Sequence, residues 1–243
     1  MNLEGVELSE RKKLTSHFVI LITGDTGSGK SYAISNMSKE DKARTVVFNF
    51  DEKSISEDDS EFLKIYSGFK VQDFELVSTI EAEILKAVSS DKVDRIIIDT
   101  FTSMTKLINR WASFNFRGYD VWGNYNNSIT QIIHTLKSGT LTYGKFGYVM
   151  GHYPPKEGND IKRYLTTKGR EHTNIIEEQF NTVVESFIAD GAVFYRADVW
   201  DTSDTTKTKL KEGNFKFKRE SLTDLEDLFN RVKKIEDNEL VKA

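Results

Sequence analysis

A glycine-rich segment directly behind an apolar run constrains the fold of this chain more than any other feature. Residues 22–31 read ITGDTGSGKS, and the stretch 24–31 satisfies the pattern G-x-x-x-x-G-K-[ST] at every position. In such a loop, glycines let backbone N–H groups curl around a β-phosphate, the lysine reaches the β- and γ-phosphate oxygens, and the serine hydroxyl binds Mg²⁺. The sequence therefore predicts a strand, a phosphate-binding loop and a helix, in that order. The predicted nucleotide contacts are Gly24, Asp25, Thr26, Gly27, Ser28, Gly29, Lys30, Ser31 and Tyr32, with Lys30 catalytic and Ser31 a metal ligand.

Short apolar runs that alternate with helical patterns predict an α/β fold. The predicted strands are 18–23, 45–50, 94–99 and 146–151, and the predicted helices lie at about 30–38, 79–89 and 121–137. This alternation implies a mainly parallel sheet with helices on both faces. After residue 181 the pattern changes to two strands joined at Asp190-Gly191, a short strand at 215–218 and an amphipathic helix that begins at Ser221. We expect these C-terminal strands to extend the sheet in antiparallel fashion.

Length and composition limit the number of domains and the compartment. A chain of 243 residues can form one α/β domain. We place it at 18–235, with 1–17 as an N-terminal segment that could pack on a neighbouring subunit and 236–243 as a tail. The absence of cysteine, of a signal-peptide core and of any apolar run of about 18 residues favours a cytoplasmic protein without a membrane partner. The net charge of −4 disfavours a protein that coats nucleic acid, but it allows a local basic groove.

Two further predicted strands end in acidic residues that could serve a bound nucleotide. The run RIIIDT ends in Asp99, which is suited to hold Mg²⁺ through water. The run TVVFNFDEKS ends in Asp51 and Glu52, either of which could orient the attacking water. We prefer Glu52 with Asp51 as the fallback, and a solvated acidic loop is the structural alternative. Thr100 follows Asp99 at the position where hexameric AAA-type motors usually carry glutamate. The chain has no Asn-Lys-x-Asp motif, with which GTPases recognise guanine, and no clear arginine-rich lid of the kind that small-molecule kinases carry. ATP and Mg²⁺ are the expected cofactors.

This order of motifs resembles the RecA-like ATPases, and most of all the bacteriophage nucleotide-binding proteins of that group, which include the RecA-like single-strand annealing proteins. The likeness is also carried by VWGNYNNSITQIIHTLK (121–137), YVMGHY (148–153) and DTTKTKL (204–210). The resemblance implies a RecA-like P-loop NTPase core, with His152 as a γ-phosphate sensor. It also implies a homo-oligomeric ring or filament in which Lys207 and Lys209 enter the neighbour's ATP site. The structural alternatives are a strand-end histidine and an exposed strand edge guarded by lysines.

The resemblance further implies two DNA-facing loops, and the residues there can be tested independently. The first, 100–119, carries Lys106, Arg110, Trp111 and Arg117 as DNA-binding candidates, and the second, 154–172, carries Lys162, Arg163, Lys168 and Arg170. The first loop suits single-stranded DNA because cations contact phosphates and aromatic rings stack on bases, whereas the second is a long loop with an excess of cations. The alternatives are that the aromatic residues of the first loop fill a core and that the second is an ordinary surface loop.

Together these patterns predict an ATP-binding and ATP-hydrolysing RecA-like protein that binds single-stranded DNA in phage recombination, annealing or replication. Its setting would be the host cytoplasm if the chain is phage-encoded, with phage single-strand-binding or replication proteins as partners. Two alternatives remain open. One is an ATP-gated adaptor of replication proteins with little turnover, and the other is a small-molecule phosphotransferase.

Overall fold

The computed structural model describes residues 19–153, 180, 182–197, 215–218, 221–223 and 225–226. These residues form one eight-stranded sheet with the order β3-β2-β4-β5-β1-β6-β7-β8. The strands are β1 (Val19–Thr23), β2 (Thr45–Asn49), β3 (Lys64–Tyr66), β4 (Arg95–Asp99), β5 (Phe146–Met150), β6 (Thr182–Ala189), β7 (Ala192–Ala197) and β8 (Phe215–Lys218). The helices are α2 (Lys30–Ser35), α3 (Lys39–Lys42), α4 (Leu76–Val88), α5 (Phe101–Asn115) and α6 (Asp120–Tyr143), with a 3₁₀ turn, η1, at Asp59–Glu61.

The strand directions confirm the predicted α/β fold. The strands from β3 to β6 in the sheet order are parallel to their neighbours, whereas β7 and β8 are antiparallel. The predicted strands agree with the observed ones to within a few residues, and the turn at Asp190-Gly191 joins β6 to β7. The prediction missed β3, because this edge strand has only three residues, none of them fully buried.

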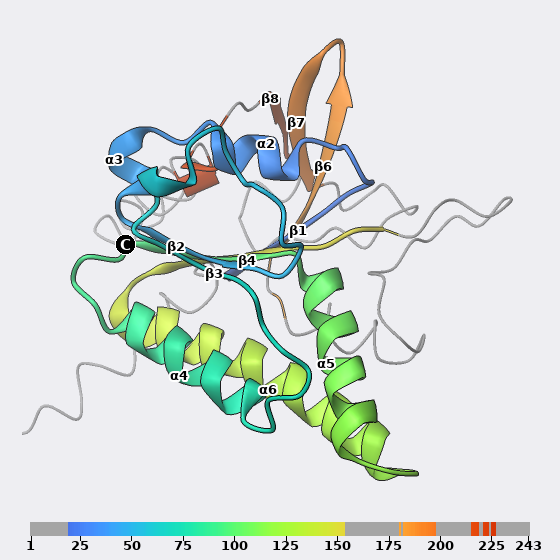
Figure 1. Ribbon diagram of the computed structural model, residues 1–243. Helices are drawn as coiled ribbons and strands as arrows, with labels where there is room; N and C mark the ends of the chain where they lie inside the picture. Colours follow the sequence, from blue (N-terminus) through green and yellow to red (C-terminus); the bar gives the residue numbers. More distant parts are fainter. Residues whose placement is uncertain are drawn as a thin grey trace, which may run out of the picture.

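Helices cover both faces of the sheet (Figure 1). Helices α4, α5 and α6 lie on one side, and α2 and α3 lie on the other. Alternate side chains of a strand point to opposite faces. Accordingly, Val19 and Leu21 of β1 join the core under α4–α6, while Ile20 and Ile22 join the core under α2 together with Leu225 of the C-terminal segment. This alternation places β1, and the loop that follows it, in the middle of the molecule.

The segment after β4 is a helix and not the loop that the RecA resemblance implied. Thr100 is the N-cap of α5, and its hydroxyl oxygen accepts a hydrogen bond from the backbone N–H of Ser103 at 3.2 Å. The helix then buries one apolar stripe, made of Phe101, Met104, Ile108, Trp111 and Ala112. The prediction of a DNA-facing loop over 100–119 is therefore wrong for residues 101–115, because the period of these apolar residues suits a packed helix.

A buried ion pair anchors the C-terminal segment at the amino ends of the parallel strands, whereas the phosphate loop lies at their carboxyl ends. Arg95, at the start of β4, donates from Nε and Nη2 to the two carboxylate oxygens of Glu226 at 2.5 and 2.7 Å. Tyr148 donates its hydroxyl to the same carboxylate at 3.0 Å, and Asp41 pairs with Arg95 at 2.9 Å. Within the described part of the chain, none of the helices combines the length and hydrophobicity needed for a membrane span.

Candidate nucleotide site

The predicted phosphate loop, residues 24–31, connects β1 to α2 at the carboxyl edge of the sheet. A Cβ atom at Gly24 would lie 2.4 Å from the backbone oxygen of Ser186. Gly29 has a φ of 91°, and a Cβ atom there would lie 2.5 Å from Val193 Cγ2. Both positions therefore require glycine. Ser186 also donates its hydroxyl to the carbonyl of Ser28 at 2.7 Å. Residues of β6 and β7 therefore pack directly against the loop.

Lys30 is buried within the phosphate loop. Its ammonium donates to the carbonyls of Gly24 and Asp25, each at 2.9 Å, and to the hydroxyl of Ser28 at 3.0 Å. Burial lowers the pKa of Lys30 to about 8, against the attraction of Asp99 and other nearby carboxylates. A charged ammonium held where water stabilises it poorly is suited to bind an anion such as a phosphate.

Asp99 ends β4 beside the phosphate loop and is only 4% exposed. Burial raises its pKa to about 6, and Asp51 acts in the same direction, whereas Lys30 and a hydrogen bond from Ser31 lower it. Its Oδ1 atom is buried and has no hydrogen-bond partner among the described residues.

The oxygen atoms of Asp99 and Ser31 fit the Mg²⁺ that accompanies a nucleotide. No cluster of three or more acidic or histidine side chains in the described ranges could hold a metal ion by itself. Mg²⁺ is usually bound by one or two protein ligands, substrate phosphates and water. The orphaned oxygen of Asp99, with the hydroxyl of Ser31 bonded to this carboxylate, is a donor set of this kind.

His152 follows β5, which lies between β1 and β4 in the sheet. Its backbone N–H donates to Thr102 Oγ1 at 3.0 Å, and the next residue, Tyr153, donates its N–H to the Gly24 carbonyl at 3.1 Å. Burial lowers the pKa of His152, and the neighbouring Lys30 lowers it further, which favours the neutral imidazole. This position suits the predicted sensor role, which stays a prediction.

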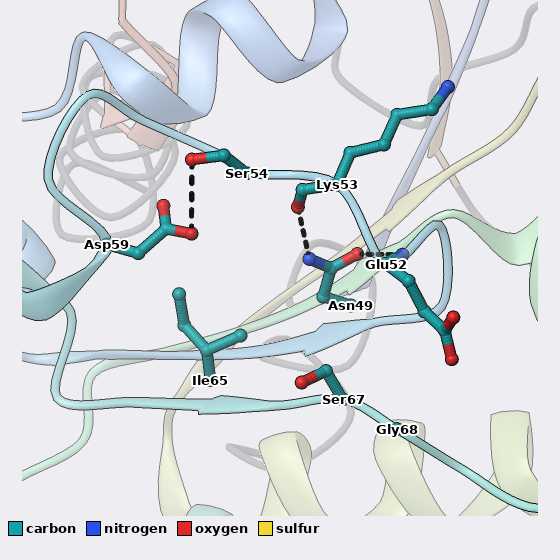
Figure 2. A pocket seen from close by; sticks show the side chains of 8 residues that line it. All are labelled: Asn49, Glu52, Lys53, Ser54, Asp59, Ile65, Ser67 and Gly68. Carbon is teal, nitrogen blue, oxygen red and sulfur yellow. Dashed lines mark hydrogen bonds between the residues drawn. The ribbon is translucent and has the colours of Figure 1, made fainter.

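The loop after β2 is shaped by the amide of Asn49 (Figure 2). Its oxygen accepts from the Glu52 N–H at 3.0 Å, and its nitrogen donates to the Lys53 carbonyl at 2.6 Å. Glu52 takes a left-handed conformation, with a φ of 56°. Its side chain is exposed and lines a pocket of about 570 Å³ together with residues of the β3 end such as Ser67 and Gly68.

Asp51, in contrast, is bonded to the start of α5. Its Oδ1 atom accepts hydrogen bonds from the hydroxyls of Thr100, at 3.1 Å, and of Ser103. Asp51 is also among the charges that most affect the pKa values of Lys30 and Asp99, and Glu52 is not. The structure therefore brings the fallback residue of the sequence analysis, rather than the preferred one, into the site.

Two residues of β6 that the sequence patterns do not predict also contribute to the site. Glu185 pairs in register with Thr23 and is buried, and its charge raises the pKa of Lys30. Ser186 supports the loop as described above. The available signal was a glutamate and a serine inside an otherwise apolar strand, NTVVESFIA, since a buried carboxylate needs a partner.

Trp111 is a core residue and not a base-stacking one. It is 5% exposed, its indole N–H donates to the Asp73 carbonyl at 3.0 Å, and its ring packs edge-on against Phe116. The prediction that Trp111 binds DNA is therefore wrong, because the faces of a buried ring are not accessible to bases. The alternative, that aromatic side chains of this segment fill a core, is confirmed for Trp111 and Phe101.

The other DNA-binding candidates of this segment are exposed. Lys106 and Arg110 lie on the outer side of α5, and Arg117 donates to three carbonyls of the α5 C-terminus at 2.9, 3.2 and 3.3 Å. Phe114 and Tyr119 at the same end are 55% and 95% exposed. We call these two rings and the side chains of Arg110 and Arg117 the α5–α6 tip. The remaining candidates, namely Lys162, Arg163, Lys168, Arg170, Lys207 and Lys209, lie outside the described residues, as do segments 1–17 and 236–243.

Comparison with known families identifies the class of protein. A family model described as an AAA domain matches residues 16–210. Because this match spans most of the sequence, the chain belongs to this AAA domain family, a class of P-loop NTPases. No curated protein matches the sequence. The sequence argued against a hexameric AAA-type motor because Thr100 follows Asp99, and the family match holds without the usual glutamate at that position.

Proposed function

We propose that the protein binds MgATP at the phosphate loop and hydrolyses it. One observation carries this proposal. Lys30 after β1, Asp51 after β2, Asp99 at the end of β4 and His152 after β5 converge at one edge of the sheet, where the charges of Lys30 and Asp51 act on both Asp99 and His152. Membership of a P-loop NTPase family supports the same conclusion.

Each of these side chains has a role that its surroundings support. Lys30 neutralises the β- and γ-phosphate oxygens, and Ser31 and Asp99 would hold the metal ion. Mg²⁺, when bound, withdraws charge from the phosphate oxygens. A carboxylate after β2 orients the water, whose oxygen bonds to the γ-phosphorus as the bond to the bridging oxygen breaks. ADP leaves with that electron pair, and the proton of the water passes to the carboxylate and then to solvent.

We also propose single-stranded DNA as the partner of the ATP cycle, in phage recombination, annealing or replication. The α5–α6 tip supports this proposal, because exposed aromatic rings stack on bases while arginines contact phosphates. The other end of α5 lies in the nucleotide site, where Ser103 bonds Asp51 and Thr102 bonds the backbone of His152. Helix α5 thus joins the nucleotide site to the α5–α6 tip. The RecA resemblance adds a homo-oligomer with Lys207 and Lys209 acting between subunits.

Phosphate release from MgATP, with and without single-stranded DNA, tests both parts. We expect turnover in the wild type, stimulation by DNA, and loss of both in Lys30→Ala. Lys86→Ala is the matched control, since Lys86 is an exposed lysine in the last turn of α4. A double variant, Arg110→Ala with Phe114→Ala, should keep basal turnover and lose the stimulation.

The outcomes separate the proposed function from its alternatives. Nucleotide binding without turnover would favour the ATP-gated adaptor. Turnover that ignores DNA and rises with a small phosphoacceptor would favour the phosphotransferase. Turnover that is equal in the wild type and in Lys30→Ala would refute the proposed site.

A further inference from the structure

Two hydroxyl groups at the start of α5 hold the Asp51 carboxylate. Thr100 Oγ1 donates to Asp51 Oδ1 at 3.1 Å, and Ser103 Oγ donates to the same oxygen. The Ser103 N–H in turn donates to Thr100 Oγ1 at 3.2 Å, so the two hydroxyl-bearing residues are fixed relative to each other. Because both hydroxyls bind Oδ1, they set the rotation of the carboxylate without using Oδ2.

The backbone on either side of Asp51 is also held. On the preceding side, Phe50 donates its N–H to the carbonyl of Asp99 at 2.7 Å, and Asn49 pairs in register with Asp99. On the following side, the Asn49 amide bonds the N–H of Glu52 and the carbonyl of Lys53 (Figure 2). The Asp51 carboxylate is therefore fixed with respect to the strand that carries the metal-binding candidate.

We propose that Thr100 and Ser103 are positioning residues that hold Asp51 as the water-orienting carboxylate, and that Glu52 does not serve this role. The inference rests on the proposed hydrolysis of MgATP. The charge of Asp51 acts on Lys30, whereas the Glu52 side chain is exposed and lines the pocket at the end of β3. General-base groups typically contribute about 10²- to 10⁴-fold to a rate, and small displacements of a reacting group cost up to about 10²-fold.

Removal of one hydroxyl should thus weaken stabilisation of the transition state and leave the binding of ATP in the ground state unchanged. For Ser103→Ala we expect kcat to fall about 10- to 100-fold with the KM for ATP unchanged within about twofold. Ser103→Thr, which keeps a hydroxyl, should recover most of the rate. Asp51→Asn should lose at least as much as Ser103→Ala, and combining the two should add little, because both act through one carboxylate.

A binding measurement provides a readout independent of turnover. The complex of MgADP with aluminium fluoride mimics the phosphoryl group together with the attacking water. Ser103→Ala and Asp51→Asn should bind this complex about 10- to 100-fold more weakly than the wild type, yet bind MgADP equally well. Glu57→Gln, an exposed carboxylate of the same loop, is the matched control. Glu52→Gln is the discriminating variant, for which we expect no more than a twofold change in either quantity.

The results that overturn the inference differ from those that overturn the proposed function. A wild type that binds and hydrolyses MgATP, with Ser103→Ala unchanged in both kcat and aluminium fluoride binding, would refute the positioning role. A loss confined to Glu52→Gln would assign the water to Glu52 instead. A wild type without turnover would refute the proposed function, and the inference with it. If Ser103→Ala does not fold, Asp51→Glu tests the same geometry without altering α5, and wild-type activity in that variant would refute the inference.

Discussion

Replacing Lys30 with methionine should stabilise the nucleotide-free protein at pH 7 while abolishing nucleotide binding. Methionine has a similar length and shape but no charge, so the substitution removes the buried ammonium with little change in packing. The carbonyl of Gly24 keeps a hydrogen bond from the Tyr153 N–H at 3.1 Å, and Asp25 is exposed and can be hydrated. The two carbonyls that lose a donor are therefore not left unsatisfied.

The size of the effect follows from the pKa of Lys30. Burial lowers it from 10.5 to about 8. At about 1.4 kcal/mol per pH unit, the charged form of Lys30 costs the folded state about 3 kcal/mol relative to the unfolded chain. The side chain is only 3% exposed, so solvent screening reduces this value little. Lys30→Met should recover up to this amount.

The pH dependence of the effect distinguishes it from a simple change in packing. For a lysine with a lowered folded-state pKa, the unfolded chain binds more protons between pH 8 and 10.5. The wild type should therefore gain stability relative to Lys30→Met over this window, and the advantage of the variant should be complete below pH 8 and gone near pH 10.5. Urea unfolding of both proteins at pH 7, 9 and 10.5 measures the difference, and the lack of cysteine avoids thiol chemistry at high pH.

The control is Lys86→Met, an exposed lysine whose replacement should change the free energy of unfolding by no more than about 0.5 kcal/mol. A Lys30→Met variant that is less stable than the wild type at every pH would refute the reasoning. That result would mean that the three hydrogen bonds of the ammonium outweigh the cost of its burial.

Three further predictions concern other parts of the molecule. Glu226→Gln should lower the free energy of unfolding by about 3 kcal/mol in a urea titration, because it leaves the buried Arg95 without its main counter-charge; a change below about 1 kcal/mol would contradict this. Gly29→Ala should weaken binding of a fluorescent nucleotide by at least about tenfold, since the new Cβ would meet Val193, and Val193→Ala should restore part of the loss. Mg²⁺-dependent nucleotide binding should weaken by up to about tenfold per pH unit below pH 6, as Asp99 takes up a proton, and constant affinity from pH 8 to 5 would disprove that assignment.

Local sequence patterns were sufficient where one segment determines its own structure. The phosphate loop was predicted because closely spaced glycines between an apolar strand and a helix leave few other conformations. The strands β1, β2, β4 and β5 were predicted because each is a short, buried, mostly β-branched or aromatic run. The turn at Asp190-Gly191 was predicted from the left-handed preference of these two residue types, and both have positive φ.

Predictions that depended on the position of a side chain relative to distant segments were less successful. The cations around Trp111 in the sequence predict a DNA-binding residue, but its position on α5 buries the ring against Phe116 and bonds its indole N–H to the Asp73 carbonyl. The sequence favours Glu52 over Asp51 as the water-orienting residue, whereas the structure places Asp51 next to Thr100 and Ser103, and the role of either residue stays a prediction. The position of the Asp51 carboxylate depends on the hydroxyls at the start of α5, which lie far from it in the sequence, whereas the left-handed conformation at Glu52 accompanies a local hydrogen bond to Asn49.

The sequence by itself determined that this protein has an α/β core with a phosphate-binding loop and an aspartate at the end of a buried strand. These features follow from local chemistry, namely backbone freedom, the period of apolar residues and the spacing of one motif. The tertiary structure decided that Asp51 and Glu185 also lie near Lys30, because the strand order brings the ends of β2, β4 and β5, and the register partner of Thr23 in β6, to one edge of the sheet. It also decided the pKa values there, since burial, which no short segment produces alone, lowers the pKa of Lys30 and raises that of Asp99.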